Sequence, residues 1–310
     1  MWRLVFALML WSNLQSSWAQ TAAASPIAPA EIKRQLDSGV RHGLLFELKR
    51  GDQHGWLYGT MHVGKPGVLP IDAEVMRAVQ QVKAIAVEVD ITDSARMQAA
   101  VRRYAYYPSG RTLADDLSAD DLRKLDAWLA TRGIPRESAL ALKPWMLGAT
   151  LVIVEAQRSG LSAELGADGV LIGIARAAQK PVREIETIDE QFDVLAAGSA
   201  KEQAADLMEL IGSLQSGEEL SELTTLAQAW LAADRAGLEA ALDRLRSDPR
   251  ASAQRSVDQV IIGRNRRMAE RIDAMLQREP TLAAVGALHL VGDQSVLVEL
   301  TKRGWTIKPR

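Results

Sequence analysis

Runs of apolar residues divide the chain into strand-rich ends and a long helical middle. Near the front, apolar runs at residues 44–48 and 56–59 predict a pair of strands. Apolar residues at helical spacing follow over residues 71–82, and a short apolar run at 84–89 predicts a further strand. The front of the folded chain is therefore predicted to alternate strand, helix and strand.

The end of the chain repeats this order, with a predicted strand at 282–285, a helix at 293–303 and a strand at 305–308. Residues 94–276 are predicted to be mostly helical, with one strand at 181–186. Strands that are joined through a helix are usually parallel. We therefore expect an α/β fold with one mixed sheet, in which two β-α-β units lie side by side. The helical segment would be a large insertion that covers the site.

A Gly-x-x-His motif follows a predicted strand in each unit. The motifs occupy residues 59–62 and 286–289 and end in His62 and His289, two of only four histidines. In open parallel sheets, sites form beyond the carboxyl ends of the strands. Imidazole is suited to proton transfer near neutral pH and to binding zinc. The repeated motif predicts one site built from both ends of the chain, whereas a single motif would more simply mark a hydrogen-bonded core histidine.

Two carboxylates end predicted strands. Strand alternation places Glu88 on a face with small alanines, in a strand apolar enough to be buried. A buried Glu88 needs a cation, a metal ion or its own proton. Glu186 ends the strand at 181–186, where a solvated strand end, a general base and a further ligand are all open. Residues 187–190 match a capping box for the next helix.

One cation lies where the pattern calls for an apolar residue. Along the helix predicted over residues 257–276, Arg264 lies inside the apolar stripe and Asn265 lies at its edge. A guanidinium that faces a core must pair with carboxylates or bind an anion. We expect either a structural salt bridge with Glu88 or Glu186, or an anion site. Asn265 could orient a ligand.

Two features of the helical middle concern packing. The Lys-Pro-Trp sequence at 143–145 opens a strongly apolar helix, because proline at the first helical position loses no hydrogen bond. Trp145 is expected in the core or in the lining of a pocket. Gly166, Gly169 and Gly173 fall in one predicted helix and lack the Lys-Ser/Thr ending of a phosphate-binding loop, so close helix packing is the expected explanation.

The first residues predict export. Residues 1–19 have the pattern of a secretory signal peptide, with an apolar run at 4–11 that is too short to span a bilayer. An uncleaved anchor is the alternative. Residues 20–30 are predicted to be a disordered linker, and residues 31–310 a single folded domain. We expect a periplasmic or secreted protein with no stable membrane insertion after cleavage.

Composition removes several classes of chemistry. The chain has no cysteine, which excludes disulfides, cysteine-zinc sites and thiol nucleophiles. Its formal net charge of -2 provides no excess of positive charge of the kind that binds nucleic acid or an anionic membrane surface. No nucleic acid is therefore expected as a partner.

These motifs together resemble the TraB/GumN family, whose wider relatives include the Tiki-type metalloproteases. The resemblance extends over about residues 40–307. It is carried by the two Gly-x-x-His motifs with Tyr58 before the first, Glu88 between valines, Lys143-Pro144-Trp145, Glu186-Thr187 with Gln191, and Arg264-Asn265.

The resemblance implies an α/β fold with an active site containing His62, His289, Glu88, Arg264 and Glu186. Tiki-like members are divalent-metal-dependent peptidases. The expected function is that of an exported metal-dependent hydrolase, most simply a peptidase, whose partner would be a peptide or another small substrate.

In that function the two histidines and Glu88 would bind the metal ion and leave a position open for water. Glu186 would take the proton of the water, and Arg264 would stabilise the oxyanion. Asn265 and Trp145 would contact the substrate. Two alternatives remain open. One is metal-free hydrolysis of an ester by histidine and glutamate, as in erythromycin-esterase-like proteins. The other is a non-catalytic protein that sequesters a peptide or regulates through binding it.

Overall fold

The computed structural model describes residues 27–310. The predicted signal peptide and most of the predicted linker fall within residues 1–26 and lie outside the described residues. The first described helix, α3 (Pro29–Asp37), begins two residues before the expected domain start at Glu31. Within residues 27–310, no helix is both long enough and apolar enough to cross a membrane.

The centre of the fold is a six-stranded mixed sheet with the strand order β4-β3-β5-β2-β1-β6. Strands β2, β5, β3 and β4 run parallel to one another, whereas β1 is antiparallel to both β2 and β6. The strands are β1 (Leu44–Arg50), β2 (Gln53–Thr60), β3 (Ala84–Val87), β4 (Val182–Glu184), β5 (Thr281–Gly286) and β6 (Thr306–Pro309). The α/β class and the mixed sheet predicted from the pattern are confirmed.

The two β-α-β units are interleaved, so the expectation that they lie side by side is wrong. Strand β5 of the second unit lies between β2 and β3 of the first unit. All six residues of β5 are buried, which suits a central strand that is covered on both faces. Strand β6 is mostly exposed and occupies an edge. The register sets Thr60 opposite Gly286. Both Gly-x-x-His segments therefore leave neighbouring strands at their carboxyl ends, on the same side of the sheet.

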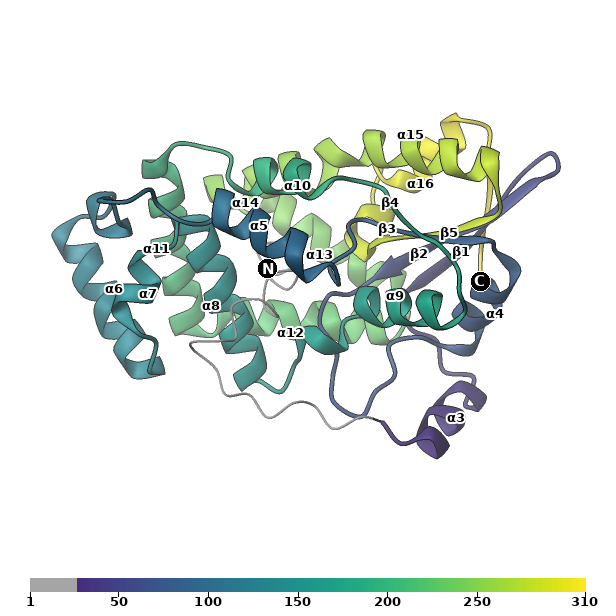
Figure 1. Cartoon of the computed structure of the whole chain (residues 1–310), viewed down its shortest axis with the longest axis horizontal. Coiled ribbons are helices and arrows are strands. Elements are labelled where there is room, and N and C mark those ends of the chain that lie inside the picture. Colours follow the sequence, from purple (N-terminus) through teal and green to yellow (C-terminus); the bar gives the residue numbers. More distant parts are fainter. Residues whose placement is uncertain (1–26) are drawn as a thin grey trace.

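Helices cover the sheet and form the insertion. Helix α15 contacts β2 and β5, and α9 contacts β3 and β4; Figure 1 shows these two helices above and below the strands. Helices α6, α7, α8 and α11 gather at the end of the molecule that is far from the sheet (Figure 1). The α-helices after α3 are α4 (Ala73–Gln81), α5 (Ser94–Tyr104), α6 (Ala119–Arg132), α7 (Arg136–Leu140), α8 (Pro144–Arg158), α9 (Ala167–Ala177), α10 (Ile188–Leu195), α11 (Ala200–Ser216), α12 (Glu218–Leu231), α13 (Arg235–Ser247), α14 (Ala251–Arg255), α15 (Gly263–Arg278) and α16 (Val296–Lys302).

Four short turns of other helix types complete the fold. Three are 3-10 turns, η1 (Leu113–Asp115), η2 (Ala163–Leu165) and η4 (Ala287–Leu290), and η3 (Ser256–Ile262) is a π-helix. The single helix predicted over residues 257–276 is thus a π-helix followed by α15. Short π-helical segments are rare in proteins, and those that occur often lie at functional sites. This one leads directly into Arg264.

Two close backbone approaches dock the loop of His62 onto the start of α9. A Cβ atom at Gly64 would lie 2.1 Å from the carbonyl oxygen of Leu165, and one at Gly166 would lie 2.5 Å from the carbonyl oxygen of His62. Only glycine fits at such distances. The expectation of helix packing therefore changes for Gly166, because it packs against this loop. The contact brings Asp168, the second residue of α9, next to His62.

We predict that Gly166→Ala lowers the free energy of unfolding by about 1–3 kcal/mol, because the added methyl group meets backbone that cannot yield cheaply. Urea unfolding of the mature chain measures this change. Gly173→Ala is the matched control on α9, since nothing lies within 4 Å of its added Cβ. The control should be stabilising, by up to about 1 kcal/mol. A Gly166→Ala protein as stable as the wild type would contradict the docking.

Candidate functional site

The predicted site residues gather at the carboxyl ends of four neighbouring parallel strands. His62 lies two residues after β2, and Glu88 directly follows β3. Glu186 lies two residues after β4, and His289 is on η4, which directly follows β5. Since these ends share one edge of the sheet, segments distant in the sequence meet there. Both histidines and both carboxylates are buried.

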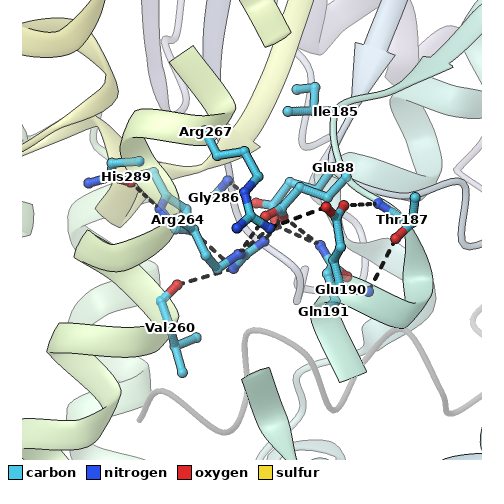
Figure 2. Close-up of polar contacts among 12 residues, drawn as sticks. Glu88, Ile185, Thr187, Glu190, Gln191, Val260, Arg264, Arg267, Gly286 and His289 are labelled. Carbon is cyan, nitrogen blue, oxygen red and sulfur yellow. Dashed lines mark hydrogen bonds and ion pairs between the residues drawn. The ribbon is translucent and has the colours of Figure 1, made fainter. Parts of the chain in front are cut away.

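Glu88 is held by three donors. Its Oε1 accepts a hydrogen bond from the backbone N–H of Gly286 at 2.7 Å. Its Oε2 accepts hydrogen bonds from Arg264 Nη2 at 2.6 Å and from Gln191 Nε2 at 3.2 Å. Figure 2 shows Glu88 with Gln191 on one side and Arg264 on the other. The buried carboxylate thus has the cation that the sequence required.

Glu186 shares the same partners. Arg264 Nε donates to both oxygens of Glu186 at 3.1 Å, and Arg264 Nη2 also pairs with Oε2. Gln191 Nε2 donates to Oε2 at 3.2 Å. The remaining guanidinium nitrogen, Nη1, donates to the carbonyl oxygen of Val260 at 3.2 Å and faces His289 Nε2 at 3.4 Å (Figure 2). Arg264 therefore pairs with both candidate carboxylates at once.

Electrostatics favours the ionised form of Glu88. Burial alone would raise its pKa, but the Arg264 guanidinium, the two imidazoles and the Gly286 N–H lower the pKa to about 2. Burial would lower the pKa of Arg264, and the charges of Glu88 and Glu186 instead raise it. Each charge therefore keeps the other ionised although both side chains are buried.

His62 is oriented by a carboxylate from α9. Its Nδ1 lies 2.6 Å from Asp168 Oδ2, and Asp168 Oδ1 accepts a hydrogen bond from the Thr60 hydroxyl at 2.7 Å. Burial opposes protonation, but the charge and hydrogen bond of Asp168 raise the pKa of His62 above its ordinary value, with help from Glu88. The other ring nitrogen, Nε2, is buried and has no hydrogen-bond partner among the described residues. A buried polar nitrogen of this kind is costly unless a ligand satisfies it.

His289 has a contrasting environment. Its Nδ1 lies 2.6 Å from Asn265 Oδ1, and Asn265 Nδ2 donates to the carbonyl oxygen of Gln294 at 2.7 Å. Burial lowers the pKa of His289 to about 3; Glu88 opposes this shift, whereas Arg264 and His62 add to it. His289 is thus neutral near neutral pH, with its proton on Nδ1 and the lone pair on Nε2. Asn265 contacts His289 through its side-chain oxygen, and its contact with substrate stays a prediction.

The side chains converge over Gly286. A Cβ atom at this glycine would lie 3.5 Å from Glu88 Oε1, 3.5 Å from His62 Nε2 and 3.6 Å from His289 Cδ2. The missing side chain leaves room at the point where the three groups meet. Next to it, His62 and His289 line a mostly apolar pocket together with Thr60, Met61, Leu226, Leu238, Val260, Ile261, Gly286, Ala287 and Leu288.

The donor set fits a divalent metal ion. Metal-binding histidines typically donate their second N–H to a carboxylate or an amide oxygen, as His62 and His289 do to Asp168 and Asn265. His62, His289 and Glu88 could hold such an ion, and the unpartnered His62 Nε2 faces the open point at Gly286. As the side chains stand, no group of three His, Asp or Glu residues within residues 27–310 has metal-binding geometry. A bound ion would therefore require them to move inwards.

Trp145 lies outside this cluster. It lines a neighbouring pocket with Val194, Leu195 and Val260, and its indole Nε1 has no hydrogen-bond partner among the described residues. Its rings pack against Phe192 with centroids 5.6 Å apart. Contact of Trp145 with substrate stays a prediction, and this pocket is where that contact would occur.

Two residues of the site had no predicted role. The sequence pattern indicated no role for Asp168. Gly166, two residues before Asp168, was the available signal, because this glycine allows the close backbone approach that brings Asp168 to His62. Gln191 entered only through the family resemblance, yet its Nε2 bridges Glu88 and Glu186. A polar residue one helical turn after the capping Thr187 was the available signal, since it turns inwards on α10.

The fold and the site define an α/β protein whose paired Gly-x-x-His segments surround a buried carboxylate and arginine cluster. The chain belongs to the TraB/PrgY/gumN family, whose model matches residues 44–309. It is 27% identical over 244 residues to the YbaP proteins of Shigella flexneri and Escherichia coli (strain K12), both described as uncharacterized. The match covers 78% of this chain and 86% of each relative. No solved structure matches the chain.

The depressed pKa of Glu88 predicts an acid-sensitive fold. The ionised form contributes stability that is present above the ordinary pKa of 4.5 and is lost as the pH falls towards 2. Glu88→Gln should be less stable at neutral pH and should lose less stability than the wild type on acidification. Thermal unfolding of both proteins over this pH range measures the difference. Because Arg271 also lowers the pKa of Glu190 to about 2, only the difference between the proteins reports Glu88. Parallel pH curves would contradict the prediction.

Proposed function

We propose that the chain is an exported metal-dependent hydrolase that acts on peptides. Family membership supports a shared fold and site, and the signal-peptide pattern of residues 1–19 supports export. The choice of a metal-dependent reaction has a separate basis, which is the charge and the nitrogen donors of the buried cluster.

The observation that carries the proposal is an excess of buried negative charge. The carboxyl groups of Glu88, Glu186 and Asp168 are buried around the two imidazoles, and Arg264 is the one buried Lys or Arg among the described residues. If all three carboxyl groups are ionised, two negative charges lack a cation. Buried charges are stable only when they are compensated. A divalent cation held by two neutral histidines and Glu88 would balance this excess.

The proton positions on both histidines also support the proposal. Each Nδ1–H is directed at an oxygen, Asp168 Oδ2 for His62 and Asn265 Oδ1 for His289. Each Nε2 therefore carries a lone pair towards the interior of the site. Two imidazole nitrogens and one carboxylate are a common ligand set of catalytic zinc, which leaves a position for water or substrate.

The other residues would perform the proton transfer and bind the developing charge. A bound divalent cation would polarise the scissile carbonyl and lower the pKa of water. Glu186 would accept the proton of the attacking water, since Arg264 and Gln191 hold it beside Glu88. The proton would then pass to the leaving amine.

Arg264 would supply the oxyanion donor through Nη1. Its Nε and Nη2 are committed to the carboxylates, whereas Nη1 has a long 3.4 Å contact to His289 Nε2. One N–H of Nη1 donates to the carbonyl oxygen of Val260, and the other, which faces His289 Nε2, would turn to the oxyanion when His289 Nε2 is engaged by another group.

A second candidate is metal-free hydrolysis with His62 as the general base. The His62–Asp168 pair with a free Nε2 resembles the histidine and aspartate of a catalytic triad. Activity on peptides or esters that survives strong chelation would select it over the metal-dependent reaction.

We predict that the mature chain binds about one divalent ion and that His62→Ala and His289→Ala abolish stoichiometric binding, because each removes one of three ligands. Metal analysis after dialysis and calorimetric titration with zinc measure binding, and cleavage of a peptide mixture followed by mass spectrometry measures activity. His54→Ala is the matched control, since His54 is on β2 at the hairpin turn away from the site. Unchanged zinc affinity in the His62 variant would overturn the metal-dependent proposal.

Asp168→Asn should lower metal affinity and hydrolysis by about 10–100-fold, as expected when the group that orients a metal ligand is changed. The amide can present its N–H₂ to His62 and move the imidazole proton to Nε2, which removes the lone pair. Thr60→Val, which deletes only the hydrogen bond to Asp168, should have a smaller effect in the same direction. If Asp168→Asn binds zinc like the wild type, Asp168 does not orient a ligand.

A further inference from the structure

A second pocket adjoins the site across the π-helix. Its apolar lining includes Trp145, Ala149, Val194, Leu195 and Val260. Val260 also lines the pocket of His62 and His289, and its carbonyl oxygen accepts a hydrogen bond from Arg264 Nη1. The two pockets therefore share one lining residue, and that residue contacts the proposed catalytic arginine.

The indole of Trp145 presents an unused donor. Trp145 is 7% exposed, and its Nε1 has no hydrogen-bond partner among the described residues. Phe192 packs against the indole at an interplanar angle of 62°, which restricts its orientation. A buried N–H without an acceptor is unfavourable, and an acceptor on a ligand would remove this penalty.

The charges of the pocket do not select a charged ligand. Arg255 and Asp206 also line it and pair with each other. The apolar residues, the balanced ion pair and the indole N–H together favour an uncharged apolar group that carries a hydrogen-bond acceptor. A peptide offers this combination where an aliphatic side chain is next to a main-chain carbonyl.

We propose that this pocket is a substrate subsite that binds one aliphatic side chain of a peptide, while Trp145 Nε1 donates a hydrogen bond to the adjacent carbonyl oxygen. The inference rests on the proposed function, because it places the reacting bond across Val260 beside His62 and Glu88. Trp145 and Ala149 would then determine specificity at a position next to the cleaved bond.

The test is a titration of the mature chain with N-acetyl-L-leucine methylamide, which carries an aliphatic side chain between two carbonyl groups. The indole N–H resonances are followed by NMR, and Trp145→Phe assigns the resonance of Trp145. We expect that resonance to shift in a saturable way, because its N–H gains an acceptor. Trp145→Phe, which keeps an aromatic ring but removes the donor, should bind the probe about fivefold more weakly.

Trp128 on α6 is the matched control. Its Nε1 is also buried without a partner among the described residues, its ring lies under the Arg132 guanidinium at 4.5 Å, and it does not line this pocket. Its resonance should not move, and Trp128→Phe should bind the probe like the wild type. Ala149→Leu fills the pocket and should abolish the saturable shift of Trp145. A Trp145 resonance that does not move, or one that shifts equally in Ala149→Leu, would overturn the subsite.

The two proposals can fail separately. If the probe binds at Trp145 and the chain cleaves no peptide, the subsite stands as a binding site and the hydrolase proposal fails. If the chain cleaves peptides and Ala149→Leu leaves the preference for aliphatic residues beside the cleaved bond unchanged, the subsite fails. Loss of that preference in Ala149→Leu, with cleavage of other peptides retained, supports both.

Discussion

The ion pairs of Arg264 with Glu88 and Glu186 hold the functional edge of the sheet together. One guanidinium from α15 joins the carboxyl ends of β3 and β4, and Glu88 extends the connection to β5 through the Gly286 N–H. Removing the arginine would leave two adjacent carboxylates buried without their cation, a change that typically costs about 3–5 kcal/mol. Because the same contacts fix the position of Glu88 beside both histidines, the stability of this edge and the geometry of the site depend on one interaction.

The two histidines differ in their electrostatic surroundings. Burial disfavours the charged form of both, but the charge and hydrogen bond of Asp168 raise the pKa of His62, whereas burial, with smaller contributions from Arg264 and His62, lowers the pKa of His289 to about 3. Groups of one chemical type whose pKa values are moved apart by their surroundings usually have separate roles. His289 is suited to remain a neutral donor of a lone pair, and His62 can either share its lone pair or hold a proton.

Much of the site could be predicted from local sequence because each signal is short in range. Strand ends followed by Gly-x-x-His place His62 and His289, and a cation inside an apolar helical stripe identifies Arg264. The order of the strands could not be predicted in this way, because the insertion of β5 between β2 and β3 depends on pairings between residues far apart in the chain. The role of Asp168 could not be predicted for the same reason. Its contact with His62 joins residues 106 positions apart, and no helical or strand periodicity in the sequence indicates that contact.

The charge of the cluster connects the two candidate reactions. If the three carboxyl groups buried near the imidazoles are ionised, the one buried guanidinium leaves two negative charges, of which a divalent cation would balance both and a proton on His62 would balance one. Either source would act at His62 Nε2, which has no hydrogen-bond partner among the described residues. A cation would use its lone pair, whereas general-base catalysis would give it a proton from the attacking water. In either proposed reaction this nitrogen would be the reactive one, and Asp168, whose Oδ2 lies 2.6 Å from the opposite ring nitrogen, would orient the imidazole for both.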